Sequence, residues 1–481
     1  MQQVPCPGCG APVEFKSAAS VMAVCGFCKT ALLKDADSIR DLGKMSEVLE
    51  DYSPLQIGTT GQFAGRAFSL LGRIQLRYAD GFWNEWYALF DDGANGWLSD
   101  ASGQYALTFV KQTTAELPLF EKLVPGRILH ALGQAYAISD VRTAKCVAGQ
   151  GELPFQVGQG WETRAADFRA GDHFLTLDYS DPKRTQAYVG QAIQLGDIKA
   201  QLLRDPSQIS DTAGRFHGKV SALSCPSCGA PVACAPGITV HIVCPSCHAQ
   251  VDTTGAAAAV LAAGAKAESV HFTLALGDSS TLDGVRYTIL GAMRRADDDG
   301  YSWSEYLLYA PGRKFVWLVE TDEGWQRAEV LDRWPDWDGA GHASIDRVNF
   351  AQSSQYNARV TFAAGSFNWR VNLGDRVQVT EFAAGNMRLA AEVTREEMTW
   401  SRSGPLPLDQ VRASAGAHIH ADQHPHPKYS DTARRLLIAL LAVNCIPLLF
   451  ATGNVFPYVL LGAAAIYLPA FFLDKLEANG Q

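Results

Sequence analysis

The stretch CPGCGAPVEF at residues 6–15 recurs almost unchanged as CPSCGAPVAC at residues 225–234, which is 219 positions further along the chain. In both places a gap of fifteen residues separates this C-x-x-C pair, or knuckle, from a second one. Two thiolates three positions apart on a tight turn can bind one side of a metal ion, and the second knuckle completes a tetrahedron. The spacing therefore predicts two zinc ribbons, each with one structural Zn²⁺ ion. The predicted ligands are Cys6, Cys9, Cys25 and Cys28 in the first ribbon and Cys225, Cys228, Cys244 and Cys247 in the second.

Two other interpretations of the knuckles remain open, namely disulfide pairs and redox-active C-x-x-C motifs. A redox motif normally occurs singly on a βαβ unit, and no such unit is evident in this sequence. The chain has eleven cysteines, an odd number, and its start lacks the basic and apolar regions of a secretory signal, which favours a reducing compartment. Gly10 and Gly229 directly follow the second cysteine of a knuckle, where the left-handed backbone conformation turns N–H groups toward sulfur.

The repeat extends beyond the knuckles. With the same offset, FSLLG at residues 68–72 matches YTILG at residues 287–291. One inserted residue later, WNEWY at residues 83–87 matches WSEYL at residues 303–307. The chain therefore contains two copies of one unit, each a ribbon followed by a globular segment.

The globular segments have the pattern of β structure. Short runs rich in β-branched and aromatic residues alternate with turns rich in Gly, Asp and Asn, and no long run has helical spacing. The sequence predicts a mainly β fold, with antiparallel barrels or sandwiches. The predicted parts are ribbon one at 1–33, a helical linker at 34–52, a β domain at 53–215, ribbon two at 220–253, an Ala-rich helical linker at 254–269, a β domain at 270–412, a His-rich flexible linker at 413–433 and a transmembrane hairpin at 434–473.

The C-terminal region predicts a membrane anchor. Residues 436–473 form a run of 38 residues without a charge. A single helix of that length would be about 57 Å long, whereas the bilayer core is about 30 Å thick. The TGN sequence at residues 452–454 interrupts the run, so two spans joined by a turn fit best. Basic residues flank both ends, which places both termini in the cytoplasm at a bacterial inner membrane. The alternative is a helical pair buried in a soluble core.

The His-rich linker carries four histidines, which could bind a metal or sense pH, although its small and Pro-rich neighbours favour a flexible linker. They are His418, His420, His424 and His426.

Composition and motifs argue against two classes of function. The net charge of −9 and the pI of about 5.7 make nucleic-acid binding unfavourable. The sequence contains no G-x-S-x-G, P-loop or H-E-x-x-H motif, and four cysteine ligands leave a zinc ion no open position for substrate. We therefore predict a non-enzymatic protein.

A Trp-x-Glu element is the one recurrent candidate for a ligand site. On a strand, residues i and i+2 share a face, so each glutamate lies beside an indole. Such a pair could be an acid with a raised pKa, or could bind a small cation through charge and cation–π attraction. The alternative is structural, with the glutamate accepting hydrogen bonds or pairing with an arginine such as Arg73 or Arg294. The candidate residues are Trp83 and Glu85 in the first copy and Trp303 and Glu305 in the second.

The W-x-E-[WY] element, the GELPF segment at residues 151–155 and the paired ribbon resemble a bacterial family of uncharacterised proteins, the domain of unknown function numbered four-one-seven-eight. The resemblance covers residues 53–215 and 270–412. The second copy departs from the first in this segment, with Ser366, Phe367 and Asn368 in place of Glu152, Leu153 and Pro154, which argues against a shared functional role for Glu152. The resemblance implies an association with polyamine synthesis and envelope stress, and it implies no catalytic residues.

These observations together predict a membrane-anchored cytoplasmic scaffold or adaptor. Its expected partners are proteins at the membrane and, through the hairpin, the lipid bilayer. The alternative is a sensor of small cations such as polyamines that uses the Trp–Glu pockets. A membrane-tethered enzyme is a third, weaker alternative.

Overall fold

The structure is a computed structural model, and it divides into two units, residues 1–417 and 418–481, which are described separately. It describes residues 2–17, 19–34, 39–44, 53–113, 116–157, 161–181, 183–205, 207–209, 223–232, 241–252, 259–262, 272–310, 313–337, 339–415, 429–445 and 452–479. The four histidines of the predicted His-rich linker lie outside these residues, whereas its described ends, 413–415 and 429–433, are helical and not flexible linker.

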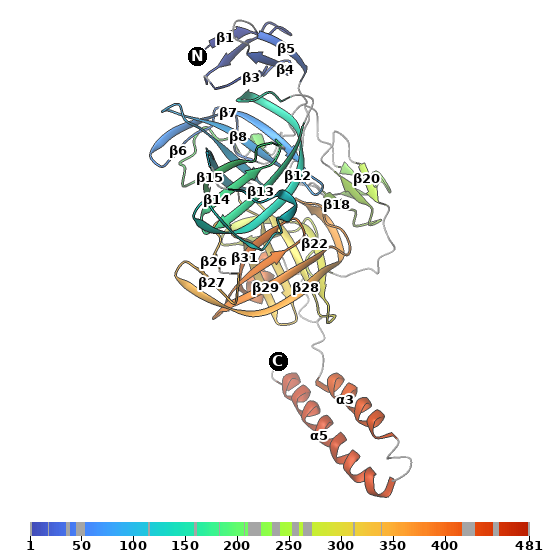
Figure 1. Cartoon of the computed structure of the whole chain (residues 1–481). Helices are drawn as coiled ribbons and strands as arrows, with labels where there is room; N and C mark the ends of the chain where they lie inside the picture. The colour runs from blue at the N-terminus through green and yellow to red at the C-terminus, as the bar shows by residue number, and fades with distance from the viewer. Residues whose placement is uncertain are drawn as a thin grey trace. The chain divides into compact units, whose positions relative to one another are not determined.

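The first globular segment is an antiparallel barrel (Figure 1). Eight strands pair in the order β12-β13-β14-β15-β10-β9-β8-β7, and pairing between β12 and β7 closes the ring. The short strands β6 and β11 add to β7 and β12, and a 3₁₀ turn, η1, spans Phe120–Lys122. The strands are β6 (Thr60–Phe63), β7 (Arg66–Arg77), β8 (Phe82–Phe90), β9 (Asn95–Ala101), β10 (Gln104–Lys111), β11 (Ile128–Ala131), β12 (Gln134–Leu153), β13 (Glu162–Ala170), β14 (His173–Asp178) and β15 (Gln186–Ile193).

The second globular segment repeats this barrel strand for strand. The order is β28-β29-β30-β31-β25-β24-β23-β22, and pairing between β28 and β22 closes it. The mainly β fold and the duplication are therefore confirmed, with barrels in both copies. The strands are β21 (Ser279–Leu282), β22 (Val285–Asp297), β23 (Ser302–Tyr309), β24 (Val316–Thr321), β25 (Gly324–Val330), β26 (Asp336–Trp337), β27 (His342–Ile345), β28 (Val348–Phe367), β29 (Arg376–Ala384), β30 (Met387–Val393) and β31 (Met398–Leu406).

One glycine pair marks the closing seam of each barrel. The 20-residue strands β12 and β28 pair with one neighbour along their first part and with β7 or β22 along their last part. In this last part Gly151 lies opposite Gly72, and Gly365 lies opposite Gly291. Gly151 and Gly365 have positive φ, and a Cβ atom on them would lie 2.2 Å and 2.4 Å from a backbone carbonyl oxygen. Only glycine permits this close approach of the two strands.

Each ribbon is attached to its barrel by backbone pairing. In the first ribbon β3 pairs with the end of β12, and in the second ribbon β18 pairs with the end of β28. Both ribbons thus extend the sheet of the barrel that follows them in the sequence. Their strands are β1 (Gln2–Pro5), β2 (Pro12–Phe15), β3 (Met22–Val24), β4 (Thr30–Lys34), β5 (Ile39–Lys44), β16 (Leu223–Ser224), β17 (Pro231–Val232), β18 (His241–Val243), β19 (Gln250–Asp252) and β20 (Ala259–Ala262).

The prediction of helical linkers after both ribbons is wrong for the described residues. Ile39–Lys44 is strand β5, which pairs with β4, and Ala259–Ala262 is strand β20, which pairs with β19. The intrinsic preference of alanine for helix amounts to less than about 1 kcal/mol per residue. Backbone hydrogen bonding along the free edges of β4 and β19 overrides it.

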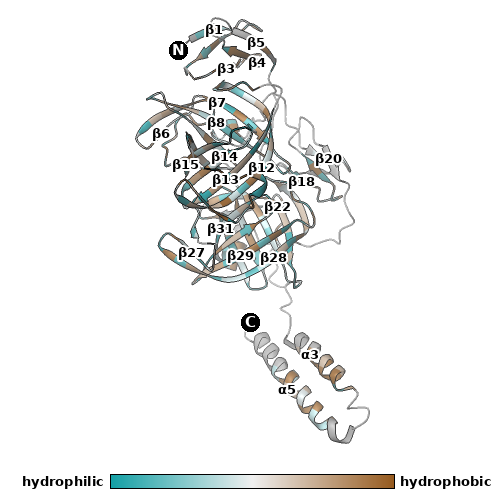
Figure 2. Cartoon of the chain, viewed as in Figure 1, coloured by the Kyte–Doolittle hydropathy of each residue, from teal (hydrophilic) through white to brown (hydrophobic). Residues whose placement is uncertain are grey.

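Apolar and polar residues are interspersed along the barrel strands (Figure 2). In the first barrel one face of the sheet carries Trp86, Leu98 and Leu107, which pack with Leu55 and Ile198 from segments flanking the strands. The second barrel has a cluster that includes Trp334, Phe350, Phe382, Leu389 and Trp400, and its counterpart in the first barrel includes Tyr136, Phe168 and Leu175. The opposite face of each sheet carries the Trp-x-Glu element.

The C-terminal part of the chain contains helices. Helix α2 (Leu408–Ala415) follows the second barrel, and α3 (Tyr429–Val443) and α5 (Thr452–Asn479) belong to the second unit (Figure 1). Gly462 of α5 faces Leu440 of α3 at close range. Within the described residues, no helix is both long enough and apolar enough to cross a membrane. The predicted transmembrane hairpin is therefore not supported by the structure.

Candidate functional site

The four cysteines of each ribbon come together as predicted. In the first ribbon the Sγ atoms of Cys6 and Cys28 lie 3.5 Å apart, and those of Cys9 and Cys25 lie 3.7 Å apart. A tetrahedral zinc ion with Zn–S bonds of about 2.3 Å requires sulfur atoms about 3.8 Å apart. A disulfide would require about 2.05 Å. The geometry fits a four-thiolate metal site, and all eight knuckle cysteines are unpaired by disulfides.

The second ribbon has the same arrangement. Both Sγ pairs, Cys225–Cys247 and Cys228–Cys244, are 3.7 Å apart. In each ribbon the four sulfur atoms lie within 4.8 Å of one another. The two clusters could therefore each hold a metal ion such as zinc.

The backbone of the knuckles supports thiolate ligands. Gly10 and Gly229 have φ values of 78° and 75°, as their position after the second cysteine predicted. Hydrogen bonds from the Thr30 hydroxyl and backbone lower the pKa of Cys28 to about 6. The backbone N–H of Ala249 lowers the pKa of Cys247 to about 7. In each ribbon one sulfur is thus favoured as the thiolate that a metal requires, whereas hydrogen bonds with neighbouring thiols raise the pKa of Cys9 and Cys228 to about 12.

A metal in these clusters would have a structural role. The first cluster lies beside a small apolar core that includes Phe15 and Leu32, and a similar core with Ile242 and Val251 lies beside the second. Cores of this size rarely fold without a metal or a disulfide. With four thiolates the coordination sphere is closed, so zinc would cross-link the ribbon and would present no position to a substrate.

Glu152 is an anchor between the first ribbon and its barrel. Its carboxylate accepts backbone hydrogen bonds from Lys16 at 2.8 Å and from Ser17 at 3.0 Å, and its side chain is buried. The equivalent residue in the second copy, Ser366, is also buried. Glu152 thus anchors the first ribbon through its side chain, and Ser366 pairs with Ile242 of the second ribbon in the β18–β28 ladder.

The Trp-x-Glu residues form the expected pairs inside each copy, in two separate barrels. In the first barrel Trp83 Nε1 donates to Glu85 at 2.9 Å, and Ser99 Oγ donates to both carboxylate oxygens at 2.9 and 2.8 Å. In the second barrel Trp303 Nε1 donates to Glu305 at 2.7 Å. Each indole therefore positions the carboxylate two residues away.

Glu305 also forms an ion pair, and the position of its partner shows which side of the sheet faces the inside of the barrel. Arg295 of β22 lies 3.5 Å from Glu305 on β23 and 3.0 Å from Glu392 on β30. Strands β22 and β30 are separated by β28 and β29 in the sheet, so Arg295 reaches β30 across the inside of the barrel. The Trp-x-Glu face is therefore the inner face. The partner is Arg295 and not Arg294, which bonds Ser304 at 3.2 Å.

The inside of the first barrel is acidic. Burial raises the pKa of Glu85 to about 7, although the hydrogen bonds from Ser99 and Trp83 oppose this change, and the charges of Asp167 and Asp100 add to it. Burial also raises the pKa of Asp167, although the hydrogen bond from Thr176 and the charges of Arg169 and Arg142 oppose this change. Arg73, the expected partner, stacks on Trp86 with 4.7 Å between the guanidinium carbon and the ring centroid, on the other face of the sheet.

The sequence interpretation missed several residues of the two interiors, namely Leu76, Ser99, Asp167, Asp178, Arg295 and Glu392. The sequence did contain one of these differences, because an alignment of the two copies puts Leu76 and Arg295 at equivalent positions.

Comparison with known proteins agrees with this duplication. The family model described as Domain of unknown function (DUF4178) matches residues 56–195 and again residues 275–408. The chain belongs to the DUF4178 family. The resemblance noted in the sequence is thus confirmed, and each DUF4178 match covers one barrel. No curated protein and no solved structure matches the chain.

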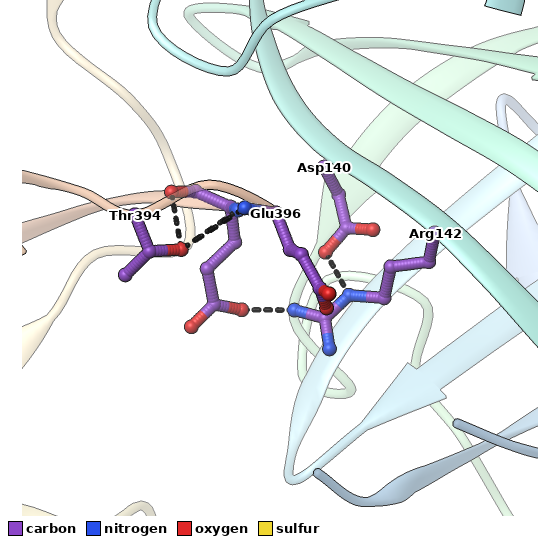
Figure 3. Close-up of polar contacts among 5 residues, drawn as sticks. Asp140, Arg142, Thr394 and Glu396 are labelled. Atoms are coloured by element: carbon purple, nitrogen blue, oxygen red, sulfur yellow. Dashed lines mark hydrogen bonds and ion pairs between the residues drawn. The ribbon is translucent and has the colours of Figure 1, made fainter. Parts of the chain in front are cut away.

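The two DUF4178 barrels contact each other through a charged cluster (Figure 3). Arg142 of β12 pairs with Asp140 and with Glu397, which lies in the turn between β30 and β31. The guanidinium carbon of Arg142 also lies 4.0 Å from the centroid of the Tyr78 ring. The Val141 N–H donates to the Glu396 carbonyl at 2.8 Å. The turn of the second DUF4178 barrel thereby docks on the first.

Burial raises the pKa of Asp140 to about 8 in this cluster, and the charge of Arg142 opposes that change. A second contact joins Arg169 to the Asp332 carbonyl at 3.0 Å, and the Trp334 N–H donates to the Gly171 carbonyl at 3.0 Å. Both contacts include hydrogen bonds to backbone groups as well as charged side chains. Backbone hydrogen bonds join particular residues, so they fix the position of one DUF4178 barrel on the other.

Proposed function

We propose that this protein is a non-enzymatic adaptor in which zinc ribbons stabilise two DUF4178 barrels and present surfaces to protein partners. The observation that carries the proposal is the closed four-thiolate geometry of both clusters. A metal ion held by four thiolates has no free coordination position, so it stabilises the fold and takes no part in a reaction. The repeated unit then provides two similar platforms in one chain.

The first ribbon has an exposed apolar side chain at its tip, which supports a docking role. Phe27 lies between the two cysteines of the second knuckle and is 79% exposed. An exposed aromatic residue on a rigid, metal-fixed turn loses little conformational entropy when a partner covers it. The ribbon tip is therefore the proposed contact point for proteins.

The adaptor function is tested by cross-linking in cells that express the chain natively. Phe27→Ser should reduce the recovery of specific partners, whereas Leu119→Ser, which changes another exposed apolar residue, should not. Partner recovery that is the same for both variants and for wild type would count against the ribbon tip. The location at an inner membrane stays a prediction, which flotation of the intact chain on lipid gradients would test. The link to envelope stress also stays a prediction.

A second candidate function is favoured by the acidic interior of the first barrel. A carboxylate buried beside an indole can bind a small cation, polyamines among them, by charge and cation–π attraction. This candidate makes the protein a sensor, in which cation binding would stabilise one barrel by mass action. A thermal-shift series with and without spermidine tests it.

A further inference from the structure

The interior of the second barrel contains a cation held by two carboxylates. Arg295 lies between Glu305 and Glu392, and its side chain is 13% exposed. The indole N–H of Trp303 donates a hydrogen bond to Glu305. The guanidinium is thus clamped across the barrel by charge-assisted contacts, which are stronger than neutral hydrogen bonds.

The first barrel retains both carboxylates of this clamp. Glu85 occupies the place of Glu305, since it follows Trp83 by two residues as Glu305 follows Trp303. Asp178 occupies the place of Glu392, because Asp178 pairs with Ala165 in the register in which Glu392 pairs with Val379.

Tyr188 on β15 indicates that the two carboxylates face the same space. Burial raises the pKa of Tyr188 to about 12, and the negative charges of Asp178 and Glu85 add to this increase. The register agrees for one acid, because Tyr188 lies two residues from Gln186, the partner of Asp178, and therefore shares a face with Asp178. Both acids are half-buried, and Asp178 also accepts a hydrogen bond from the Ser180 N–H at 2.8 Å.

The first barrel lacks the arginine. Arg295 lies opposite Trp303 in the β22–β23 pair, and Leu76 lies opposite Trp83 in the β7–β8 pair. The same equivalence holds on the other side of the strand, where Val360 pairs with Arg295 and Cys146 pairs with Leu76. Throughout the described chain, Glu85 has hydrogen bonds from Trp83 and Ser99 and no ion pair with a cationic side chain.

Side chains around this place differ in size in both directions. Tyr188 stands where the second barrel has Ser401, whereas two other changes are to smaller side chains. Ser99 lies opposite Glu85 where Val319 lies opposite Glu305, and Ala165 lies opposite Asp178 where Val379 lies opposite Glu392. The first change also adds a hydroxyl donor that orients Glu85. The first barrel therefore has both acids and the indole without an arginine at this place. Arg142 shares the face of Asp178, across Ala165, but it is paired with Asp140 and Glu397.

We infer that the interior of the first barrel binds one small organic cation between Glu85 and Asp178, at the place that the Arg295 guanidinium occupies in the second barrel. The chemical class is a guanidinium or primary ammonium head on a narrow alkyl chain, because the clamp accommodates an arginine side chain. The inference rests on the second candidate function above and assigns it to one barrel, one pair of acids and one cation per chain.

Titration calorimetry on the intact, zinc-loaded chain tests this assignment. The probes are n-propylguanidinium, which reproduces the arginine side chain, and n-butylammonium, in sodium phosphate free of other amines. Wild type should bind one molar equivalent. Glu85→Gln should weaken binding by about 30-fold or more, because it removes one partner of a buried charge pair. The surface variant Glu121→Gln is the matched control and should bind as wild type does.

Two further variants keep the inference testable if Glu85→Gln folds poorly. Leu76→Arg supplies the cation from within, as in the second barrel, and should abolish binding while raising the melting temperature. Arg295→Ala opens the clamp of the second barrel and should add a second equivalent of n-propylguanidinium. Absence of binding to wild type, or binding that survives both Glu85→Gln and Leu76→Arg, would overturn the inference. If binding is lost in Glu305→Gln and in no other variant, the cation binds in the second barrel. That result would overturn the assignment to the first barrel but would still agree with the second candidate function.

Discussion

Replacing Glu85 by glutamine should stabilise the cation-free protein at alkaline pH. The pKa of this carboxyl is raised from 4.5 to about 7, so the folded state binds more protons than the unfolded state between these values. Wild-type stability therefore falls as pH rises through this window, and the loss is complete above pH 7. A pKa difference of about 2.5 lowers the free energy of unfolding by about 3 kcal/mol at pH 8.5 and by under about 1 kcal/mol at pH 5.

Glutamine preserves the local hydrogen bonds while removing the charge. Its carbonyl oxygen can accept from Trp83 Nε1, and its amide can donate to Ser99 Oγ, the two groups that contact Glu85. The main change is thus the loss of a buried negative charge without an ionic partner. For a domain of about 150 residues, 1 kcal/mol corresponds to about 2–4 °C in melting temperature, so Glu85→Gln should melt about 6–12 °C higher at pH 8.5.

The assay is differential scanning calorimetry of the full chain at pH 5 and pH 8.5 in sodium phosphate. The matched control is Glu305→Gln, which removes one partner of Arg295 and should lower the melting temperature at both pH values. If Glu85→Gln instead lowers the melting temperature equally at both pH values, Glu85 is an ionised structural acceptor and the argument from its raised pKa is wrong.

Three other predictions concern the metal, the seam and the interface. Elemental analysis should find two zinc ions per chain, and Cys9→Ser and Cys228→Ser should each remove one. Gly151→Ala should lower the melting temperature by more than Gly133→Ala, because both residues have positive φ but only at Gly151 would a Cβ atom meet a backbone oxygen, 2.2 Å away. Arg142→Ala should accelerate hydrogen exchange of the Val141 amide by about tenfold or more, because that amide bonds the docked turn of the other barrel.

The spacing of the cysteines was sufficient to predict both metal clusters. A knuckle is a local structure, in which two thiolates and the following glycine are set by a few consecutive dihedral angles, as at Cys6, Cys9 and Gly10. The repeat of WNEWY as WSEYL likewise identified the duplication, and the family match confirms it. The alternation of β-branched residues and turns predicted a mainly β fold, because the two faces of a strand are encoded every second residue.

Tertiary structure decided everything that depends on which strands meet. Residues 39–44 and 259–262 became strands because an unpaired edge lay beside them, and local propensity is too weak to resist such pairing. Barrel closure placed Arg295 within reach of Glu392, a residue 97 positions away in the chain. The Trp-x-Glu element is the same in both copies, yet only one glutamate has an internal cation. That difference arises because the charge facing a buried carboxylate comes from strands that are neighbours only after the sheet has closed.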